Sequence, residues 1–171
     1  MGRKQYGQKT TWFIDGNNLL GHRGTPKDPN VIAEKIQAME TFSVSNDVNS
    51  THHIDSIQLV FDDGKDQAPN TVSKERSAQG IFERVSLGGT MSADDYILQE
   101  IQKLQDEDLP ARLRKVQVVT ADRDLRAKVL RTNKPIVRNV VNPVTFWRRY
   151  LPRLSGLKKK PLQEEEDEGA L

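Results

Sequence analysis

The chain of 171 residues contains no cysteine and only three histidines, which excludes several kinds of site. Without cysteine the protein can form neither a disulfide nor a thiolate metal site, and this absence fits the cytoplasm or another reducing compartment. The histidines are His22, His52 and His53. We therefore do not expect a zinc site built from histidines.

The chain also lacks a long apolar run. Only 35% of its residues are hydrophobic and 6% are aromatic, and no segment approaches the roughly 18 apolar residues of a membrane span. Residues 1–9 are basic, but no apolar segment follows them, so we expect no secretory signal and no membrane partner. The chain also lacks a Gly-Lys-Ser/Thr phosphate loop, which argues against NTP hydrolysis. It has no group of serine, cysteine or histidine residues suited to covalent catalysis, which argues against that mechanism.

What the chain does have is an uneven distribution of charge. The formal net charge is +2, but residues 163–171 hold five acids and no base, so residues 1–162 carry +7. Between Arg123 and Lys160 there are twelve lysines and arginines and a single acid, Asp124. A basic half of this kind favours a polyanionic partner such as nucleic acid or anionic lipid, although a solvated basic surface would look the same.

Short apolar segments alternate with helical patterns along the chain. We predict strands at residues 10–14, 57–61, 81–87, 116–120 and 136–141, and helices at 30–42, 92–105, 123–131 and from 143 onward. This alternation is typical of an α/β fold in which a parallel sheet is covered by helices on both faces. The last helix carries Phe146, Trp147 and Tyr150, a pattern that fits the core better than an interface.

The segments between these elements are polar. Residues 43–55 are predicted to form a loop, longer than a minimal domain needs, and residues 64–80 a mobile or partly helical excursion. We expect one domain over residues 10–154, a flexible N-terminus at 1–9 and a disordered charged tail at 155–171. The sequence gives no basis for assigning an oligomer.

Four acidic clusters follow the predicted strands or begin the predicted helices. They are Asp15, Asp62-Asp63, Asp94-Asp95, and Asp122 with Asp124. Ligands of parallel α/β sheets bind outside the carboxyl ends of the strands, so we expect these acids to converge. Two carboxylates about 4 Å apart repel by about 4 kcal/mol at an effective dielectric near 20. A divalent cation usually offsets such a cost, and oxygen-only ligands favour Mg²⁺ or Mn²⁺ over zinc.

The segment from Asp15 to Asn18 joins a strand-end carboxylate to a tight turn. Asp15 can ligate a metal, and Asn18 can orient Asp15 or a substrate phosphate. Gly16 permits either a close backbone approach or a positive φ. The alternative interpretation is an ordinary Asx turn after a strand.

The segment from Ser92 to Asp95 could cap a helix or serve a site. Ser92 with Asp95 is close to a capping box, so Asp95 could act only at the helix N-terminus. Asp94 has the helical spacing of the apolar residues Ile97 and Ile101, which places it at the end of the buried face. A carboxylate there is costly unless a polar or metallic group meets it. Asp94 is therefore the stronger candidate ligand, and Asp95 is the weaker one.

Asp122 and Asp124 follow another predicted strand. Alternate residues of an extended segment share a face, so the two could hold one ion jointly. Alternatively, both are early-helix acids that face the helix dipole. Asp62-Asp63 has the same strand-end position but is equally typical of a turn.

Taken together, four motifs resemble the NYN domain, and within it the YacP-like branch, whose members are relatives of the PIN-domain ribonucleases. The motifs lie in the family's order over residues 10–152. They are Phe13-Ile-Asp-Gly-Asn-Asn-Leu19, Leu59-Val-Phe-Asp62, Ser92-Ala-Asp-Asp-Tyr-Ile97 and Val118-Val-Thr-Ala-Asp-Arg-Asp-Leu125. The resemblance implies a PIN-like three-layer α/β/α sandwich with a mainly parallel sheet. It also implies divalent-metal-dependent endonucleolytic cleavage of RNA.

Carried over by motif, the resemblance makes Asp15, Asp94 and Asp122 the metal ligands. Asp95 and Asp124 would be accessory ligands or would position the water, and Asn18 would support Asp15. Relatives often place the last acid further from the position of Asp122, so Asp124 departs from the pattern. The basic residues nearest to this centre, which we expect to hold the RNA backbone, are Arg123, Arg126, Lys128 and Arg131.

The leading hypothesis is an endoribonuclease that depends on Mg²⁺ or Mn²⁺. A structure-specific DNA nuclease would use the same acids, and a module that binds RNA or the ribosome without cleaving would keep the same surface. An aspartate-nucleophile phosphotransferase would want a second acid where this chain has Asn17, and a topoisomerase–primase site would want glutamate in place of Asp15.

Overall fold

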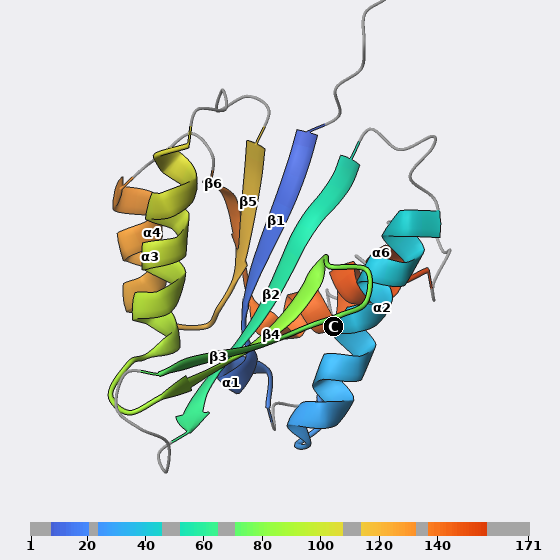
Figure 1. Cartoon of the computed structure of the whole chain (residues 1–171), viewed down its shortest axis with the longest axis horizontal. Helices are drawn as coiled ribbons and strands as arrows, with labels where there is room; N and C mark the ends of the chain where they lie inside the picture. Colours follow the sequence, from blue (N-terminus) through green and yellow to red (C-terminus); the bar gives the residue numbers. More distant parts are fainter. Residues whose placement is uncertain are drawn as a thin grey trace, which may run out of the picture.

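A six-stranded sheet is the centre of the fold (Figure 1). The computed structural model describes residues 8–20, 24–45, 52–64, 71–107, 114–132 and 137–156. The strands are β1 (Gln8–Asp15), β2 (His52–Gly64), β3 (Val72–Arg76), β4 (Phe82–Gly88), β5 (Arg114–Val119) and β6 (Val137–Val141). Their order is β3-β4-β2-β1-β5-β6, and every pair is parallel except β3 with β4. The predicted mainly parallel α/β sheet is thus confirmed.

Helices cover both faces of this sheet. They are α1 (Gly16–Leu19), α2 (Pro29–Ser45), α3 (Ala93–Gln105), α4 (Arg123–Thr132), α5 (Pro143–Thr145), the π-helical turn η3 (Phe146–Tyr150) and α6 (Leu151–Leu154). Helices α3 and α4 lie on one face, and α2 and α6 lie on the other (Figure 1). Each face therefore has its own apolar core.

The alternation of side chains along the strands sorts residues between these two cores. On β1, Ile14 belongs to the core beneath α2, whereas Phe13 belongs to the core beneath α3 and α4. On β2, Val60 lies in the same core as Phe13. The same alternation carries Asp15 and Asp62, two positions further along, to the α3 and α4 face of the sheet. Both carboxylates thus come to the carboxyl ends of neighbouring strands.

Two connecting segments differ from the prediction. Residues 43–55, expected as a loop, contain the last turn of α2 and the first residues of β2, and residues 46–51 lie outside the described part. Residues 64–80, expected to be mobile or partly helical, contain the edge strand β3, while 65–70 are not described. Every residue of β3 is exposed, so this strand lacks the apolar alternation by which a strand is recognised in a sequence.

The C-terminal helix starts at Pro143, as predicted, and continues through Pro152 to Leu154. Asn142 caps its first turn by accepting hydrogen bonds from the N–H groups of Val144 and Thr145. Pro152 has no N–H to donate to the preceding turn, and that turn is π-helical. Phe146 is fully buried, with its ring centroid 5.4 Å from that of Trp12. The aromatic residues of this helix pack on the core, as predicted.

Residues 1–7 of the predicted flexible N-terminus and residues 157–171 of the predicted charged tail lie outside the described residues. The described part extends past the predicted bounds of 10–154, because β1 begins at Gln8 and the Ser155 hydroxyl donates to the Leu151 carbonyl. Within the described ranges, no helix combines the length and apolar character that crossing a bilayer requires.

Candidate active site at the carboxyl edge of the sheet

The acidic residues surround the point at which the strand order reverses. The chain proceeds from β1 to β2 on one side of the sheet and from β5 to β6 on the other, so the reversal falls between the neighbours β1 and β5. Open α/β sheets bind ligands at this point, outside the carboxyl ends of the strands. Asp15 is the last residue of β1, and Asp122 follows β5 by three residues. These two candidate ligands therefore flank the position where a ligand is expected.

Asp15 is a buried carboxylate with little support for its charge. The residue is 4% exposed, and the N–H of Asn18 donates to its Oδ1 at a long 3.4 Å. Burial raises its pKa to about 7; the Asn18 N–H opposes the shift, and the charges of Asp62 and Asp94 add to it. In the described part of the chain no lysine or arginine forms an ion pair with Asp15. The carboxylate thus lies where a cation from outside would stabilise it.

Asp94 and Asp122 interact directly with each other. Asp122 caps α4, because its Oδ1 accepts hydrogen bonds from the N–H groups of Leu125 (3.0 Å) and Asp124 (2.8 Å). The Leu125 hydrogen bond is the main cause that lowers the pKa of Asp122. Burial and then the charge of Asp122 raise the pKa of Asp94 to about 6. The two carboxyl groups titrate as a pair, with the proton held on Asp94.

Two asparagines of α1 tie β1 to the strand on each side. The Oδ1 atom of Asn17 accepts a hydrogen bond from the N–H of Asp62 at 2.8 Å. The Oδ1 atom of Asn18 accepts from the Thr120 hydroxyl at 3.1 Å and from the Ala121 N–H at 2.6 Å. The side chain of Asn18 therefore positions the segment that carries Asp122 and does not support Asp15, to which only its backbone donates. Asn18 thus contacts Asp15 through its backbone N–H, in line with the predicted support for Asp15, while its side chain reaches across the strand-order reversal.

Asp62 belongs to the acidic group, although the sequence left its role undecided. Its Oδ2 atom accepts a hydrogen bond from the N–H of Ala93 at 2.9 Å, which fixes the first turn of α3. Its charge also contributes to the raised pKa values of Asp15 and Asp94. The signal that could have identified it is its strand-end position, which matches that of Asp15. The side chain of Asp63 lies outside the described residues.

Asp95 and Asp124 are exposed residues in the first turns of α3 and α4, next to this group. The Ser92 hydroxyl accepts a hydrogen bond from the N–H of Asp95 at 3.1 Å, so the predicted cap of α3 is confirmed. Asp124 is not part of an extended segment with Asp122, because α4 begins at Arg123. The interpretation in which the two share one face is therefore wrong, and the helix-capping interpretation describes Asp122.

Close packing, and not an unusual backbone conformation, requires glycine at position 16. A Cβ atom at this position would lie 2.5 Å from Cε1 of Phe61, and Gly16 is not among the residues with positive φ. Of the two reasons predicted for this glycine, the structure supports the close approach. A larger residue would separate β1 from β2 at the level of Asp15.

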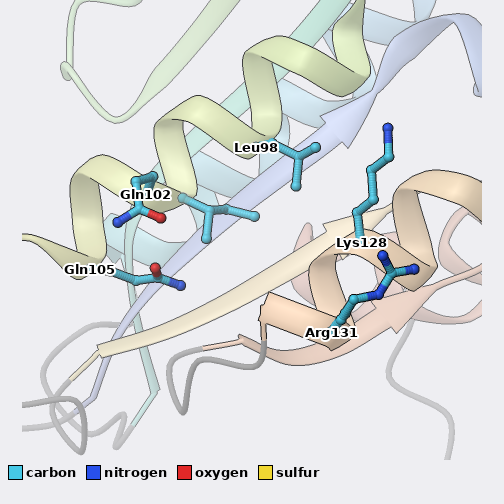
Figure 2. A pocket seen from close by; sticks show the side chains of 6 residues that line it. Leu98, Gln102, Gln105, Lys128 and Arg131 are labelled. Carbon is cyan, nitrogen blue, oxygen red and sulfur yellow. The ribbon is translucent and has the colours of Figure 1, made fainter.

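The four basic residues expected to hold RNA are all exposed on α4. The charge of Lys128 helps to lower the pKa of Asp122, so this residue lies near the acidic group. Lys128 and Arg131 also line a groove of about 490 Å³ between α3 and α4 (Figure 2). Arg123 and Arg126 do not line it. The basic surface formed by these four residues of α4 therefore adjoins the acidic group at one end. It also adjoins the groove between α3 and α4.

The donor set fits a hard divalent cation better than a softer one. In the described ranges no three acidic or histidine side chains are arranged as a finished ligand set. Magnesium, however, is usually held by one or two carboxylates together with water and substrate phosphates. The buried Asp15 carboxylate, close to the charges of Asp62 and Asp94, matches this requirement with oxygen ligands alone.

No protein-family model, curated protein or solved structure matches this chain. The case for a function therefore depends on the site itself.

Proposed function

We propose that the protein is an endoribonuclease that hydrolyses RNA phosphodiester bonds with the help of Mg²⁺ or Mn²⁺. The observation that carries this proposal is the gathering of Asp15, Asp62, Asp94 and Asp122 at the strand-order reversal of a parallel sheet. Neighbouring carboxylates repel, and in the described residues no basic side chain is ion-paired with Asp15. This arrangement supports a site completed by a cation and a substrate phosphate.

The resemblance of the four motifs to the NYN domain points to the same chemistry. The α/β sheet with helices on both faces is compatible with a PIN-like sandwich. In this proposal Asp15, Asp94 and Asp122 hold the ion, and Asp62 positions α3 through the Ala93 N–H. When bound, a divalent ion activates a water molecule and neutralises charge on the phosphate oxygens.

The chain's own residues would bind and orient the RNA. The exposed cations of α4 supply a sequence-independent attraction for the phosphate backbone, which weakens as salt is added. Asn18 holds the segment that carries Asp122, and so fixes the distance between the two sides of the site. Asp95 and Asp124 lie on exposed first turns beside the group, which suits accessory ligands better than primary ones.

Cleavage of labelled single-stranded and hairpin RNAs in Mn²⁺ and in EDTA tests the proposal. We expect cleavage that EDTA abolishes. Asp15→Asn should reduce the rate by more than the roughly 10- to 100-fold that loss of an outer-shell partner costs. Asp55→Asn is the matched control, because Asp55 is an exposed acid toward the amino end of β2.

Several results would contradict the proposal. RNA binding without metal-dependent cleavage across several RNAs would identify a non-cleaving RNA- or ribosome-binding module. Cleavage of branched or flapped DNA in preference to RNA would identify a DNA nuclease. Equal cleavage by wild type and Asp15→Asn would indicate a contaminating activity.

A further inference from the structure

The groove between α3 and α4 contains an unusual side chain, the amide of Gln105. The described residues that line it are Leu98, Ile101, Gln102, Gln105, Lys128 and Arg131 (Figure 2). The amide nitrogen and oxygen of Gln105 are both withdrawn from solvent, and neither has a hydrogen-bond partner among the described residues. A buried amide without partners is costly. A group that enters the groove and pairs with it would remove that cost.

The neighbouring glutamine shows that this feature is specific to Gln105. Gln102 is one turn earlier on the same helix, and its amide donates to Asp106 Oδ1 at 3.1 Å. Gln102 is exposed, so water can satisfy the rest of its amide. Gln105 differs, because both polar atoms of its amide are withdrawn from water and unpaired in the described structure.

The rest of the groove offers two further kinds of contact. Leu98 and Ile101 give an apolar wall on α3, and Lys128 and Arg131 bring two positive charges from α4 (Figure 2). An apolar surface, a paired donor and acceptor, and cations are together the contacts that a nucleotide requires: a flat base, a base edge and a phosphate. The volume of about 490 Å³ lies within the range of small-ligand sites.

The groove also lies on a continuous path from the acidic group. Helices α3 and α4 both start at the carboxyl edge of the sheet, where Asp94 and Asp122 lie. With a rise of about 1.5 Å per residue, Lys128 is about 9 Å along α4 from Asp122, and Gln105 about 16 Å along α3 from Asp94. These lengths suit a strand whose phosphate is at the acids and whose neighbouring nucleotides follow the helices.

We infer that this groove binds one unpaired nucleotide of the RNA strand that flanks the cleaved phosphate, with Gln105 reading the edge of its base. The inference rests on the proposed function for the identity of the strand. Adenine is the expected base, because its N6 amino group and N7 atom form an edge that takes two hydrogen bonds from a glutamine amide and that pyrimidines lack. Gln105 would thus be a specificity-determining residue, distant from the reacting atoms.

Binding of fluorescent oligoribonucleotides in EDTA tests this without requiring cleavage. We expect the wild type to bind oligo(A) about 5- to 150-fold more tightly than oligo(C) or oligo(U). Gln105→Leu should abolish this preference, and Gln105→Glu should move it toward cytosine, whose amino group a carboxylate accepts. Gln99→Leu is the matched control, because Gln99 is exposed on the same helix outside the groove and should keep the adenine preference.

The outcomes separate this inference from the proposed nuclease activity. Base preference without metal-dependent cleavage would support the groove and contradict the nuclease. Metal-dependent cleavage with equal binding of all bases, or with a preference that Gln105→Leu leaves unchanged, would overturn the inference and leave the nuclease standing. Adenosine monophosphate that binds as tightly as oligo(A) would show a site for free nucleotides and would overturn the placement on a flanking strand.

Discussion

Two buried carboxylates, Glu40 and Asp15, lie at opposite edges of the sheet in opposite surroundings. Glu40, on α2, is 1% exposed, and its Oε2 accepts hydrogen bonds from the N–H groups of Ile81 (3.0 Å) and Phe82 (3.2 Å) and from the Ser77 hydroxyl. These donors fasten α2 to the start of β4. Asp15, at the other edge, is met by the backbone of Asn17 and by the Asn18 N–H at a long 3.4 Å, and its charged neighbours are acids.

The difference separates a structural acid from a candidate functional one. Burying a carboxylate is costly unless hydrogen bonds or an opposite charge compensate it. At the amino edge the protein supplies the compensation itself, through backbone amides. At the carboxyl edge the described residues compensate the Asp15 charge only weakly. Uncompensated buried charges of this kind are typical of functional sites, whereas compensated ones are typical of structural positions.

The largest effect expected from this contrast between Asp15 and Glu40 is on how stability depends on pH in the absence of divalent ions. The pKa of Asp15 is raised from 3.8 to about 7 in the folded protein, so its ionisation destabilises the fold. That destabilisation is complete above pH 7, shrinks as the pH falls through 7, and vanishes near pH 3.8. Asp15 alone should therefore add on the order of 4 kcal/mol to the free energy of unfolding over this range, most of it by pH 5. Urea titrations in EDTA at pH 5, 6, 7 and 8 measure it.

Asp15→Asn provides the control for this prediction. The amide cannot ionise, so the variant should be more stable than the wild type at pH 8 and similar to it near pH 4. Its stability should also change less between pH 5 and 8. Parallel pH curves for the two proteins would show that Asp15 is well compensated, and the contrast with Glu40 would disappear.

Replacement of Glu40 should act in the opposite direction. Glu40→Leu puts an apolar side chain in the buried position but leaves two backbone N–H groups and the Ser77 hydroxyl without their acceptor. At about 1–3 kcal/mol for each buried group left unpaired, a destabilisation of about 3 kcal/mol is expected in chemical denaturation. Glu40→Gln retains an acceptor oxygen and should lose less. If the Glu40→Leu protein is as stable as the wild type, the hydrogen bonds to Glu40 do not stabilise the fold, and the contrast between Glu40 and Asp15 is wrong.

Added Mn²⁺ should stabilise the carboxyl edge and leave the amino edge unaffected. A ligand at 100 times its Kd raises the free energy of unfolding by about 2.7 kcal/mol. We expect a rise of this size at pH 8 for the wild type and for Glu40→Gln, but little for Asp15→Asn. The rise should be smaller at pH 5, because protons compete for the same carboxylates. Equal stabilisation of all three proteins would place the ion elsewhere.

Much of this arrangement could be predicted because it follows from strand periodicity. The apolar strands, the strand-end positions of Asp15 and Asp122, and the Ser92 cap of α3 all leave a local pattern in the sequence. The edge strand β3 has no such pattern in the sequence, because all its residues are exposed. Its extended conformation comes from pairing with β4.

What the sequence left open at the site is which group each side chain contacts. Asn18 supports Asp15 through its backbone N–H, but its side-chain amide reaches Thr120 and Ala121, about a hundred residues away in sequence, and no local pattern indicated those partners. The sequence left Asp62 open between a turn residue and a site residue, and its contact with the Ala93 N–H forms only when β2 and α3 come together. Such contacts depend on the order of strands in the sheet, which a single sequence does not encode locally.

The smallest predicted effect concerns the asparagines that hold the two sides of the site in place. Asn17→Ala removes the acceptor of the Asp62 N–H, and loss of one such hydrogen bond should cost about 1 kcal/mol of stability. Asn139→Ala, at an exposed position of β6, is the matched control and should cost almost nothing. Because Asn17 connects β1 to the strand end that carries Asp62, its loss should also reduce cleavage by about 10- to 100-fold, as loss of an outer-shell partner does. A loss of stability without a loss of cleavage would show that Asp62 supports the fold only, as Glu40 does.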